Sequence, residues 1–500
     1  MYLILSILLT YISFWGGFCS LFAWVAMVPL FSSLKQLSPA KATLYGFVYG
    51  SISWYLSTWW LSIGLYNMAE FNVVESVLIS LIPAVVNSLP YALFSFLIAK
   101  YDLLGSKPKP LCISAIMCLT VAYYPSVFPG NLAHSQVNLP LVLQIAELGG
   151  APLLFFLICL FNAYFYLALR GLPVKNSYEN LIKASLVLLC IFIFGFYKQN
   201  KWENLNEEFV KLKVGLIQPN IPISPKQNEA ATDSLGLSTA IELTKQLVKN
   251  TSRIDILIWP EMPIAFSIVN HPHDFYAIDE LIGEIQTPLL INGFYYDSFD
   301  SDDRPIFHNA LHLLRDSAHS EEKYVKNRLI PFGEYVPFES SLPFLRDLFS
   351  GVRRYTPAPE AEILKLDEHV RIAPAICLEA IYSDFISGLV NKGANIIFNP
   401  GNDAYFGLSA GPSFHSALSM LRSIEYRVPL IRVTNSGFTQ VFDAGGKQIF
   451  SSKLFESGAW SVEVPLPTSG KKNNPTERTF YLLAGLLIIQ VLSVKFRLYK

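Results

Sequence analysis

The apolar residues of this sequence are unevenly distributed, and that distribution constrains the fold most. Residues 1 to about 197 are almost continuously apolar, residues 198 to 475 carry charges throughout, and a last apolar run, FYLLAGLLIIQVLSV, closes the chain. With 52% hydrophobic and only 15% charged residues, the chain is too apolar for an ordinary water-soluble protein. The sequence predicts a helical membrane domain (1–197), a globular domain (198–475), and a final membrane helix with its tail (476–500).

The first part contains seven apolar segments that could each cross a bilayer. They lie at about residues 2–13, 17–33, 42–65, 73–99, 111–127, 140–168 and 181–197. Because the first segment is short, residues 1–33 form either two spans or one. A cleaved signal peptide is the alternative for this region, but it lacks a basic start and a second apolar stretch follows at once. With the C-terminal run, about eight spans are expected.

Lysine and arginine lie on one side of these spans only. The gaps after the third and fifth spans contain neither residue, whereas the gaps after the second, fourth and sixth contain Lys35, Lys41, Lys100, Lys107, Lys109, Arg170, Lys175 and Lys183. Basic loops stay in the cytoplasm, so the even-numbered spans end inside. The globular domain is therefore predicted to be extracytoplasmic, and the C-terminal tail to be inside.

The position of one cysteine then becomes informative. Of six cysteines, five lie in or beside apolar spans, and Cys377 is alone in the globular domain. Cysteines of extracytoplasmic domains are usually paired in disulfides. An unpaired one is either an inert core residue or a thiol kept for its chemistry.

The globular domain alternates short apolar runs with amphipathic stretches. The runs include KVGLIQPN, IDILIWPE, PLLINGFYY, RIAPAICLE, ANIIFNPGN and PLIRVTNSG, and the stretches include GLSTAIELTKQLVKN and GPSFHSALSMLRSIEY. Apolar strands separated by helices indicate an α/β fold with covered sheets. Chemistry in such folds gathers where strands end, so the polar residues after each strand are the first candidates.

Three strand ends supply five polar candidates. Glu261 follows IDILIWPE, Lys326 and Glu334 lie in YVKNRLIPFGEYVP, and Cys377 and Glu379 lie in AICLE. Taken singly, each has an ordinary explanation: a helix cap, a solvated lysine, an inert cysteine or an ion-pair partner. Taken together they form a coherent set for acyl transfer.

That set needs three chemical roles. A thiol must lose its proton to attack a carbonyl, and a nearby carboxylate can accept the proton. Burial raises the pKa of such a carboxylate and so improves it as a base. A lysine ammonium can stabilise the tetrahedral oxyanion, together with the backbone N–H of Leu378, the residue after the thiol.

The order WPE, K-N-R-L-I-P-F-G-E, C-L-E and NPGNDAYFG resembles the nitrilase superfamily. With seven spans before the domain and one after it, the whole chain is similar to the apolipoprotein N-acyltransferases. This resemblance implies an αββα sandwich in which Cys377 is the nucleophile, Glu261 the base and Lys326 the oxyanion stabiliser. It also implies that Glu334 is a second active-site glutamate and that Glu379 supports the cysteine loop.

The same resemblance implies a reaction and a location. An acyl chain would pass from a membrane phospholipid, through a cysteine thioester, to the N-terminal amine of the S-diacylglyceryl cysteine of an apolipoprotein. This is the last step of lipoprotein maturation, carried out in the bacterial inner membrane with the catalytic domain facing the periplasm. We expect a monomer that needs no cofactor.

Two other functions remain open at this stage. One is a membrane-anchored nitrilase-type amidase, which uses the same residues with water as the second nucleophile. The other is a non-catalytic membrane protein that binds or transports lipid. Leu378 and Gln227 keep the latter open, because the family commonly has an aromatic residue and a tryptophan at these places.

Two further features concern the membrane. The loop SLPFLRDLFSGVRRY places Phe344, Leu345, Leu348 and Phe349 beside arginines, which suits a lipid interface, although packing on its own domain is the alternative. Glu147 lies within the sixth apolar segment, where it either reaches the interface or pairs with another span.

Composition argues against other classes of function. The net charge of −1 and the lack of a dense basic tract argue against nucleic-acid binding. No glycine-rich nucleotide motif follows a strand. No metal site is expected, because His271, His273, His308 and His312 have no matched carboxylates.

Overall fold

The computed structural model describes the chain except for residues 69–70, 106–107, 127, 171–173, 223–228, 262–271, 300–304, 319–321, 350–351, 353, 473 and 499–500. The chain divides into two compact units. The helical unit comprises Met1–Trp59, Val77–Lys201 and Asn474–Lys500, and the α/β unit comprises Trp60–Ser76 and Trp202–Asn473. Residues 60–76 of the apolar N-terminal half therefore belong by their contacts to the α/β unit.

The helical unit is built from apolar helices. Its elements are α1 (Tyr2–Ser13), η1 (Gly17–Trp24), α2 (Val28–Leu34), α3 (Pro39–Thr58), α6 (Leu89–Lys100), α7 (Pro110–Val121), η2 (Leu132–Gln136), α8 (Pro140–Leu143), α9 (Ala146–Leu169) and α16 (Pro475–Leu498), with most of α5 (Val73–Val86) and α10 (Val174–Glu208). Many apolar side chains on these helices are exposed, as expected where lipid is the solvent.

Four segments of the described chain are long and apolar enough to cross a membrane. They are Gly17–Leu34, Val73–Lys100, Ala146–Leu169 and Asn176–Glu208, and Tyr2–Ser13 and Pro110–Val121 are shorter apolar helices. The chain therefore has the character of a membrane protein. The count of eight spans stays a prediction.

Two expected spans are interrupted. The segment predicted at 42–65 divides into α3 and α4 (Trp60–Met68). Within α9 the helix breaks at Gly149 and Gly150, whose φ angles are −149° and 65°. The carbonyl oxygen of Gly149 accepts a hydrogen bond of 2.7 Å from Thr479 Oγ1 in α16. A Cβ at Gly149 would lie only 2.2 Å from that hydroxyl, so only glycine allows this close approach of two helices.

Glu147 pairs with a residue of another helix, which is one of the two arrangements predicted for it. Its Oε1 lies 2.7 Å from Nζ of Lys198 in α10, and the Glu147 side chain is buried. Because a lone charge is costly in an apolar surrounding, this pair links α9 to α10.

The α/β unit contains two six-stranded sheets. One has the order β12-β1-β2-β3-β4-β5 and the other β11-β10-β9-β8-β7-β6. The strands are β1 (Val210–Gln218), β2 (Ile256–Ile258), β3 (Leu289–Phe299), β4 (Pro305–Leu314), β5 (Lys323–Val325), β6 (Leu364–Lys365), β7 (Arg371–Pro374), β8 (Ile396–Gly401), β9 (Leu430–Thr434), β10 (Gln440–Phe442), β11 (Gln448–Ser451) and β12 (Gly458–Leu466).

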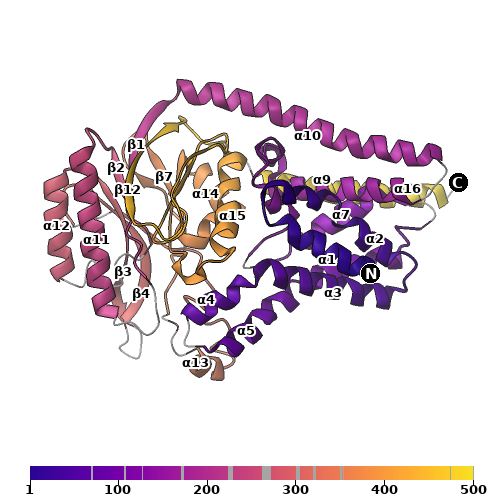
Figure 1. Cartoon of the computed structure of the whole chain (residues 1–500), viewed down its shortest axis with the longest axis horizontal. Coiled ribbons are helices and arrows are strands. Elements are labelled where there is room, and N and C mark those ends of the chain that lie inside the picture. The colour runs from indigo at the N-terminus through magenta and orange to yellow at the C-terminus, as the bar shows by residue number, and fades with distance from the viewer. Residues whose placement is uncertain are drawn as a thin grey trace. The chain divides into compact units, whose positions relative to one another are not determined.

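Two helices cover the outer face of each sheet, giving an α–β–β–α sandwich as the resemblance implied (Figure 1). One pair is α11 (Glu229–Asn250) and α12 (Pro272–Ile285), and the other is α14 (Ser383–Asn391) and α15 (Gly411–Tyr426). The pairs β1–β2, β2–β3, β7–β8 and β8–β9 are parallel. Because parallel strands end at the same edge, the residues that follow β2 and β7 each lie at the carboxyl edge of a sheet.

Apolar burial explains why the helices lie on the sheets. Leu257, Trp259 and Leu289 pack with Leu281 and Ile282 of α12 in one buried cluster. Burial of each such side chain contributes about 1.5–3 kcal/mol. The indole N–H of Trp259 donates a hydrogen bond of 3.0 Å to Thr244 Oγ1 of α11, so the one polar atom of this large side chain is satisfied.

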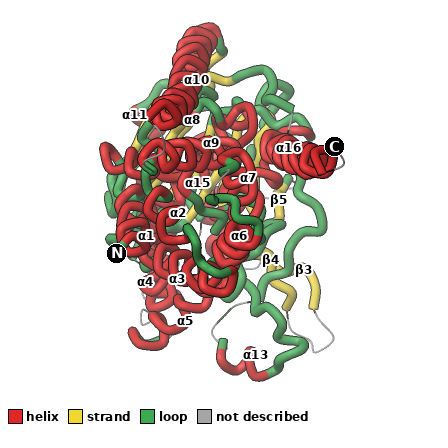
Figure 2. The backbone as a smooth tube through the Cα atoms, turned by 90° about the vertical axis from the view of Figure 1, so that its right-hand side faces the viewer, coloured by secondary structure: helices red, strands yellow, loops and turns green. Residues whose placement is uncertain are grey.

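Helix α4 packs on the α/β unit. Trp60 is fully buried, with its ring centroid 4.9 Å from that of Phe406 in η4 (Ala404–Phe406). Asn67 Nδ2 donates a hydrogen bond of 2.8 Å to the carbonyl oxygen of Tyr405. Phe71 packs against Phe349 with the ring centroids 5.7 Å apart. Figure 2 shows α13 (Phe344–Leu348), just before Phe349, as a short helical turn within a long loop.

Candidate active site

The main polar candidates lie just past three strands, as the sequence predicted. Glu261 follows β2 by three residues, Lys326 follows β5 directly, and Cys377 follows β7 by three residues. The backbone at Lys326 is fixed because its N–H donates a hydrogen bond of 2.8 Å to Asn309 O on β4. The strands thus fix the backbone from which the Glu261, Lys326 and Cys377 side chains extend.

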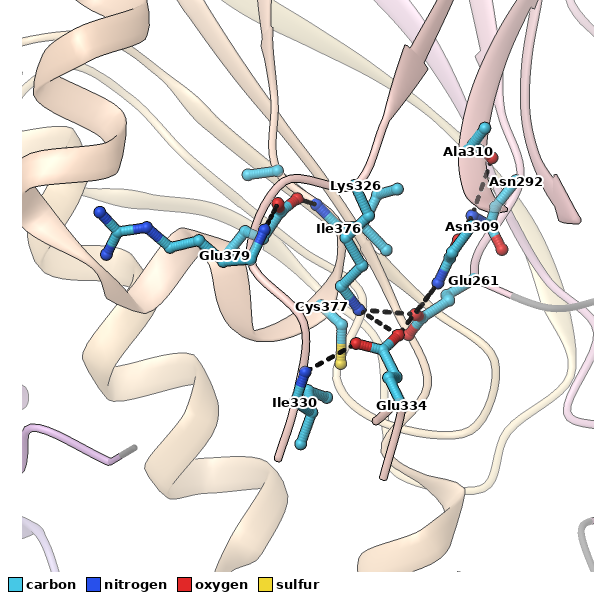
Figure 3. Close-up of polar contacts among 12 residues, drawn as sticks. Glu261, Asn292, Asn309, Ala310, Lys326, Ile330, Glu334, Ile376, Cys377 and Glu379 are labelled. Carbon is cyan, nitrogen blue, oxygen red and sulfur yellow. Dashed lines mark hydrogen bonds and ion pairs between the residues drawn. The ribbon is translucent and has the colours of Figure 1, made fainter. Parts of the chain in front are cut away.

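Lys326 lies between two carboxylates. Its Nζ is 2.7 Å from Oε1 of Glu334 and 3.5 Å from Oε1 of Glu261. Asn309 Nδ2 donates to the same two oxygens, at 3.2 Å and 3.3 Å respectively. The Lys326 side chain is 0% exposed, so water does not screen these contacts. Figure 3 shows the three charged side chains converging with Cys377 directed toward them.

Cys377 adopts a backbone conformation that is rare for a residue with a side chain. Its φ is +54°, in the left-handed region, between the end of β7 and the short helix η3 (Cys377–Ile381). This conformation costs about 1–2 kcal/mol for a non-glycine residue. Such strain on a sharp strand-to-helix turn exposes a nucleophile's side chain at the edge of a sheet. The thiol lies close enough to the Glu261 carboxylate for each group to shift the pKa of the other.

Burial and charge set the protonation of the three groups. Burial raises the pKa of Glu261, and the nearby Glu334 raises it further although Lys326 opposes both. Burial and the charge of Glu261 raise the pKa of the Cys377 thiol well above its ordinary value. Burial alone would lower the pKa of Lys326, but Glu334 and Glu261 together hold it well above the usual range. The raised pKa values of Cys377 and Lys326 therefore indicate a thiol, not a thiolate, and a charged ammonium at neutral pH.

Glu379 ties the cysteine turn to the lysine turn. Its Oε2 accepts a hydrogen bond of 2.8 Å from Ile376 N. Its Oε1 accepts from Asn327 N at 2.8 Å, Arg328 N at 2.9 Å and the Tyr324 hydroxyl at 2.7 Å. Burial raises the pKa of this carboxyl to about 7. One fully buried side chain thus links the turn after β5 to the turn after β7.

Glu334 has a second role besides its contact with Lys326. Its Oε2 accepts a hydrogen bond of 2.9 Å from Ile330 N, and its own N–H donates to Ile330 O at 2.8 Å. The Glu334 carboxylate therefore also stabilises the turn between Ile330 and Glu334.

This arrangement can perform acyl chemistry without further groups. The thiol can pass its proton to the nearby Glu261 carboxylate as the sulfur attacks a carbonyl carbon. The ammonium of Lys326 can face the oxyanion that forms. Among the described residues, no cluster of three histidines, cysteines or carboxylates has the geometry of a metal site.

Several polar residues of the site were not predicted from the sequence. Asn309 and Tyr324 contact the charged groups directly, and Asn399, Asp403 and His415 form hydrogen bonds behind Cys377. NPGNDAYFG, quoted above as a motif, contains Asn399 and Asp403, so that motif was a signal for two of them. Gln227 lies outside the described residues.

The predicted lipid loop divides into exposed and buried residues. Phe344 and Leu348 are 61% and 54% exposed. Phe349, in contrast, is buried with Val336, and Leu345 packs against the same cluster. The expectation that Phe349 meets lipid is therefore corrected, because its ring is buried and packs the loop against its own domain.

Comparison with known proteins identifies the class of the fold. Residues 213–471 match the carbon-nitrogen hydrolase family, and residues 6–164 match the apolipoprotein N-acyltransferase N-terminal domain. The first match covers the two sheets and the site between their strand ends.

Similar proteins that align with almost the whole chain identify the family within this class. Proteins named apolipoprotein N-acyltransferase are 27% identical in Geobacter metallireducens over 93% of this chain and 88% of that protein, and 27% identical in Chlorobaculum tepidum over 89% and 86%. The one from Bdellovibrio bacteriovorus is 30% identical over 70% of this chain and 65% of its own length. The chain belongs to the apolipoprotein N-acyltransferase family of the nitrilase superfamily, which confirms the resemblance inferred from the sequence.

Proposed function

We propose that this enzyme N-acylates apolipoproteins in two steps through an acyl thioester on Cys377. The acyl donor is a membrane phospholipid, and the acceptor is the N-terminal amine of an S-diacylglyceryl cysteine. The observation that carries this proposal is the convergence of the Cys377 thiol, the Glu261 carboxylate and the buried ammonium of Lys326 (Figure 3).

In the first step the Cys377 sulfur attacks the ester carbonyl carbon while its proton moves to Glu261. The negative charge that develops on the carbonyl oxygen faces the Lys326 ammonium and the N–H of Leu378. The bond from the carbonyl carbon to the ester oxygen then breaks, and Glu261 returns the proton to that oxygen. Lysophospholipid leaves, and the acyl chain stays on sulfur.

In the second step the lipoprotein amine attacks the thioester carbon. Glu261 accepts a proton from the amine and returns it to the departing Cys377 sulfur, so the free thiol is restored and an amide is formed. A thioester suits this order because it reacts readily with amines, and a shielded site limits its loss to water. The raised pKa of Glu261 supports its use as the base in both steps.

The roles of the supporting residues follow from their contacts. Glu334 would hold Lys326 in place and keep it charged, since it makes the shorter of the two ion pairs. Glu379 would hold the two turns at the distance that brings Lys326 and Cys377 together.

Placement in the membrane is part of this proposal. About eight spans, with residues 1–197 and 476–500 in the inner membrane and residues 198–475 on the periplasmic side, would explain why basic residues flank alternate spans only. The exposed side chains of Phe344 and Leu348 would meet the lipid. One chain contains every residue that the reaction needs, which favours a monomer.

The test uses purified protein in lipid micelles and a phospholipid labelled in its acyl chain. We expect label on the protein, released by neutral hydroxylamine and absent in Cys377→Ala. The matched control is Cys190→Ala, which removes an exposed cysteine of α10 and should leave labelling intact. Addition of an S-diacylglyceryl peptide should move the label to its α-amine.

Two outcomes would contradict the proposal. Release of the label as free fatty acid, at a rate that the acceptor does not change, would indicate an amidase that uses water. A folded, lipid-binding wild type that never carries label would indicate a non-catalytic protein.

A further inference from the structure

Behind the Cys377 turn lies a buried polar network that the reaction described above does not use. Asn399 lies in β8, Arg432 in β9, Asp403 in the turn after β8, and His415 in α15. All four side chains are at least nine-tenths buried. Buried polar groups are retained only where they are hydrogen-bonded, so their partners indicate what they hold.

The network ends on one atom, the carbonyl oxygen of Cys377. Asn399 Nδ2 donates to it at 2.8 Å and also donates to Ala375 O at 2.6 Å. The Asn399 amide cannot be reversed, because its Oδ1 accepts a hydrogen bond of 2.8 Å from Arg432. The two amide protons thus bracket the strained turn.

His415 contacts the same carbonyl from the helix side. Its Nε2 lies 3.3 Å from Cys377 O, and since a carbonyl only accepts, Nε2 must carry the proton. Its Nδ1 faces Asp403 Oδ1 at 2.9 Å and an Arg432 nitrogen at 3.0 Å. Arg432 in turn donates to Asp403 Oδ2 at 2.6 Å.

This geometry makes the donation independent of the ring's charge. In the neutral ring Nδ1 accepts from Arg432, and in the charged ring it donates to Asp403. Nε2 donates to Cys377 O in either state. Asp403 and Arg432 therefore orient the ring, and the ring holds the nucleophile's peptide group.

We propose that His415 is a positioning residue for acyl transfer, which together with Asn399 locks the Cys377 carbonyl and thereby directs the thiol and the Leu378 N–H. This inference rests on the proposed function of Cys377. None of the network side chains needs to contact substrate. The left-handed φ of Cys377 makes the lock necessary, because the turn would otherwise relax toward an unstrained conformation.

A pair of amide substitutions tests the lock. His415→Gln can still place an N–H where Nε2 lies, whereas the shorter His415→Asn reaches only the Nδ1 position that faces Asp403. Both side chains are polar and smaller than or similar to histidine, so their effects on packing are alike. Ser423→Ala is the control on the same helix, because that hydroxyl is buried but bonds only to Met420 O at 2.7 Å among the contacts described.

The first measurement is the rate of thioester formation from labelled phospholipid. We expect His415→Asn to lower it about 10- to 100-fold, with KM for phospholipid unchanged, and His415→Gln to restore most of the rate. His415→Leu should resemble His415→Asn. Equal rates for Gln and Asn variants, or a loss that appears only in KM or in thermal stability, would overturn the inference.

The second measurement separates this inference from the proposed function. Alkylation of Cys377 by iodoacetamide, read by peptide mass spectrometry, needs no lipid. It should slow several-fold in His415→Asn and His415→Leu but not in His415→Gln or Ser423→Ala. An unlabelled wild type with this alkylation pattern would refute acyl transfer yet support the lock, and equal alkylation in all variants would refute the lock.

Discussion

Lys326 Nζ lies 2.7 Å from Oε1 of Glu334 but 3.5 Å from Oε1 of Glu261, so one buried ammonium holds two carboxylates unequally. The closer carboxylate neutralises the lysine. The more distant one, Glu261, lies near the Cys377 thiol and has a raised pKa, so it remains available for a proton. The two glutamates therefore differ in role because they lie at different distances from the Lys326 ammonium.

This inequality predicts the effect of Glu334→Gln. Removal of the Glu334 charge leaves Lys326 to Glu261 alone, so the pKa of Glu261 should fall, because Glu334 is one of the groups that raise it. A less basic Glu261 should lower the acylation rate about 10- to 100-fold and move the acidic limb of its pH profile to lower pH. Glu339→Gln, which removes a partly exposed partner of Arg354 on the same loop, is the control. An unshifted limb would contradict the assignment.

The pH dependence of the wild type follows from the same shifts. Glu261 must be ionised to accept the thiol proton, and its pKa is raised, so the acylation rate should fall as pH drops through a value above that of an ordinary glutamate. The pKa of Lys326 lies well above 10.5, so loss of its charge should not produce an alkaline limb below that pH. Single-turnover rates between pH 4 and pH 10 measure both points. Glu261→Gln should be slow at every pH and lack the acidic limb.

Lys326→Met should destabilise the protein in a pH-dependent way. It leaves two buried carboxylates without their cation, and breaking a buried pair in this manner costs about 3–5 kcal/mol. The remaining carboxylates should bind protons more readily, so the difference in thermal midpoint from wild type should shrink as pH is lowered. Lys392→Met removes a surface partner of Glu360 and should leave the midpoint nearly unchanged. A pH-independent loss would instead indicate a packing effect.

Glu379→Gln should affect activity far more than Tyr324→Phe. The carboxylate accepts four hydrogen bonds, and an amide in its place would turn an NH₂ group against backbone N–H donors. We expect a loss of about 10-fold or more in acylation and of about 1–3 kcal/mol in stability. Tyr324→Phe removes only one of the four donors and should cost less on both measures. Comparable losses in the two variants would argue against a bridge between the turns.

Substitutions of exposed and of buried residues in the loop with α13 should have different effects, the first on lipid turnover and the second on stability. Phe344→Ser with Leu348→Ser changes two exposed side chains and should slow turnover of bilayer phospholipid without lowering the thermal midpoint or the turnover of a short soluble ester. Phe349→Ala should do the reverse, since loss of a buried phenylalanine costs about 3–5 kcal/mol. Equal loss of ester turnover in the double variant would mean that the loop does not act through lipid.

Much of the fold could be predicted from the sequence, because strands and helices here follow local patterns. The amphipathic segment GPSFHSALSMLRSIEY coincides with α15, Gly411–Tyr426. The sequence did not predict the break between α3 and α4, because an apolar run looks the same whether one helix or two pass through it. It also missed that residues 60–76 pack with the α/β unit, since only a partner such as Phe406 reveals this.

The sequence by itself determined the class of protein and the candidates Glu261, Lys326 and Cys377. Strand ends are local features, and the order of the motifs along the chain is distinctive. Only the tertiary structure decided how those residues share charge, that Glu379 joins two turns, and that His415 and Asn399 hold the Cys377 carbonyl. Hydrogen bonds and pKa shifts depend on distances of a few ångströms between residues far apart in the chain, and folding alone sets those distances.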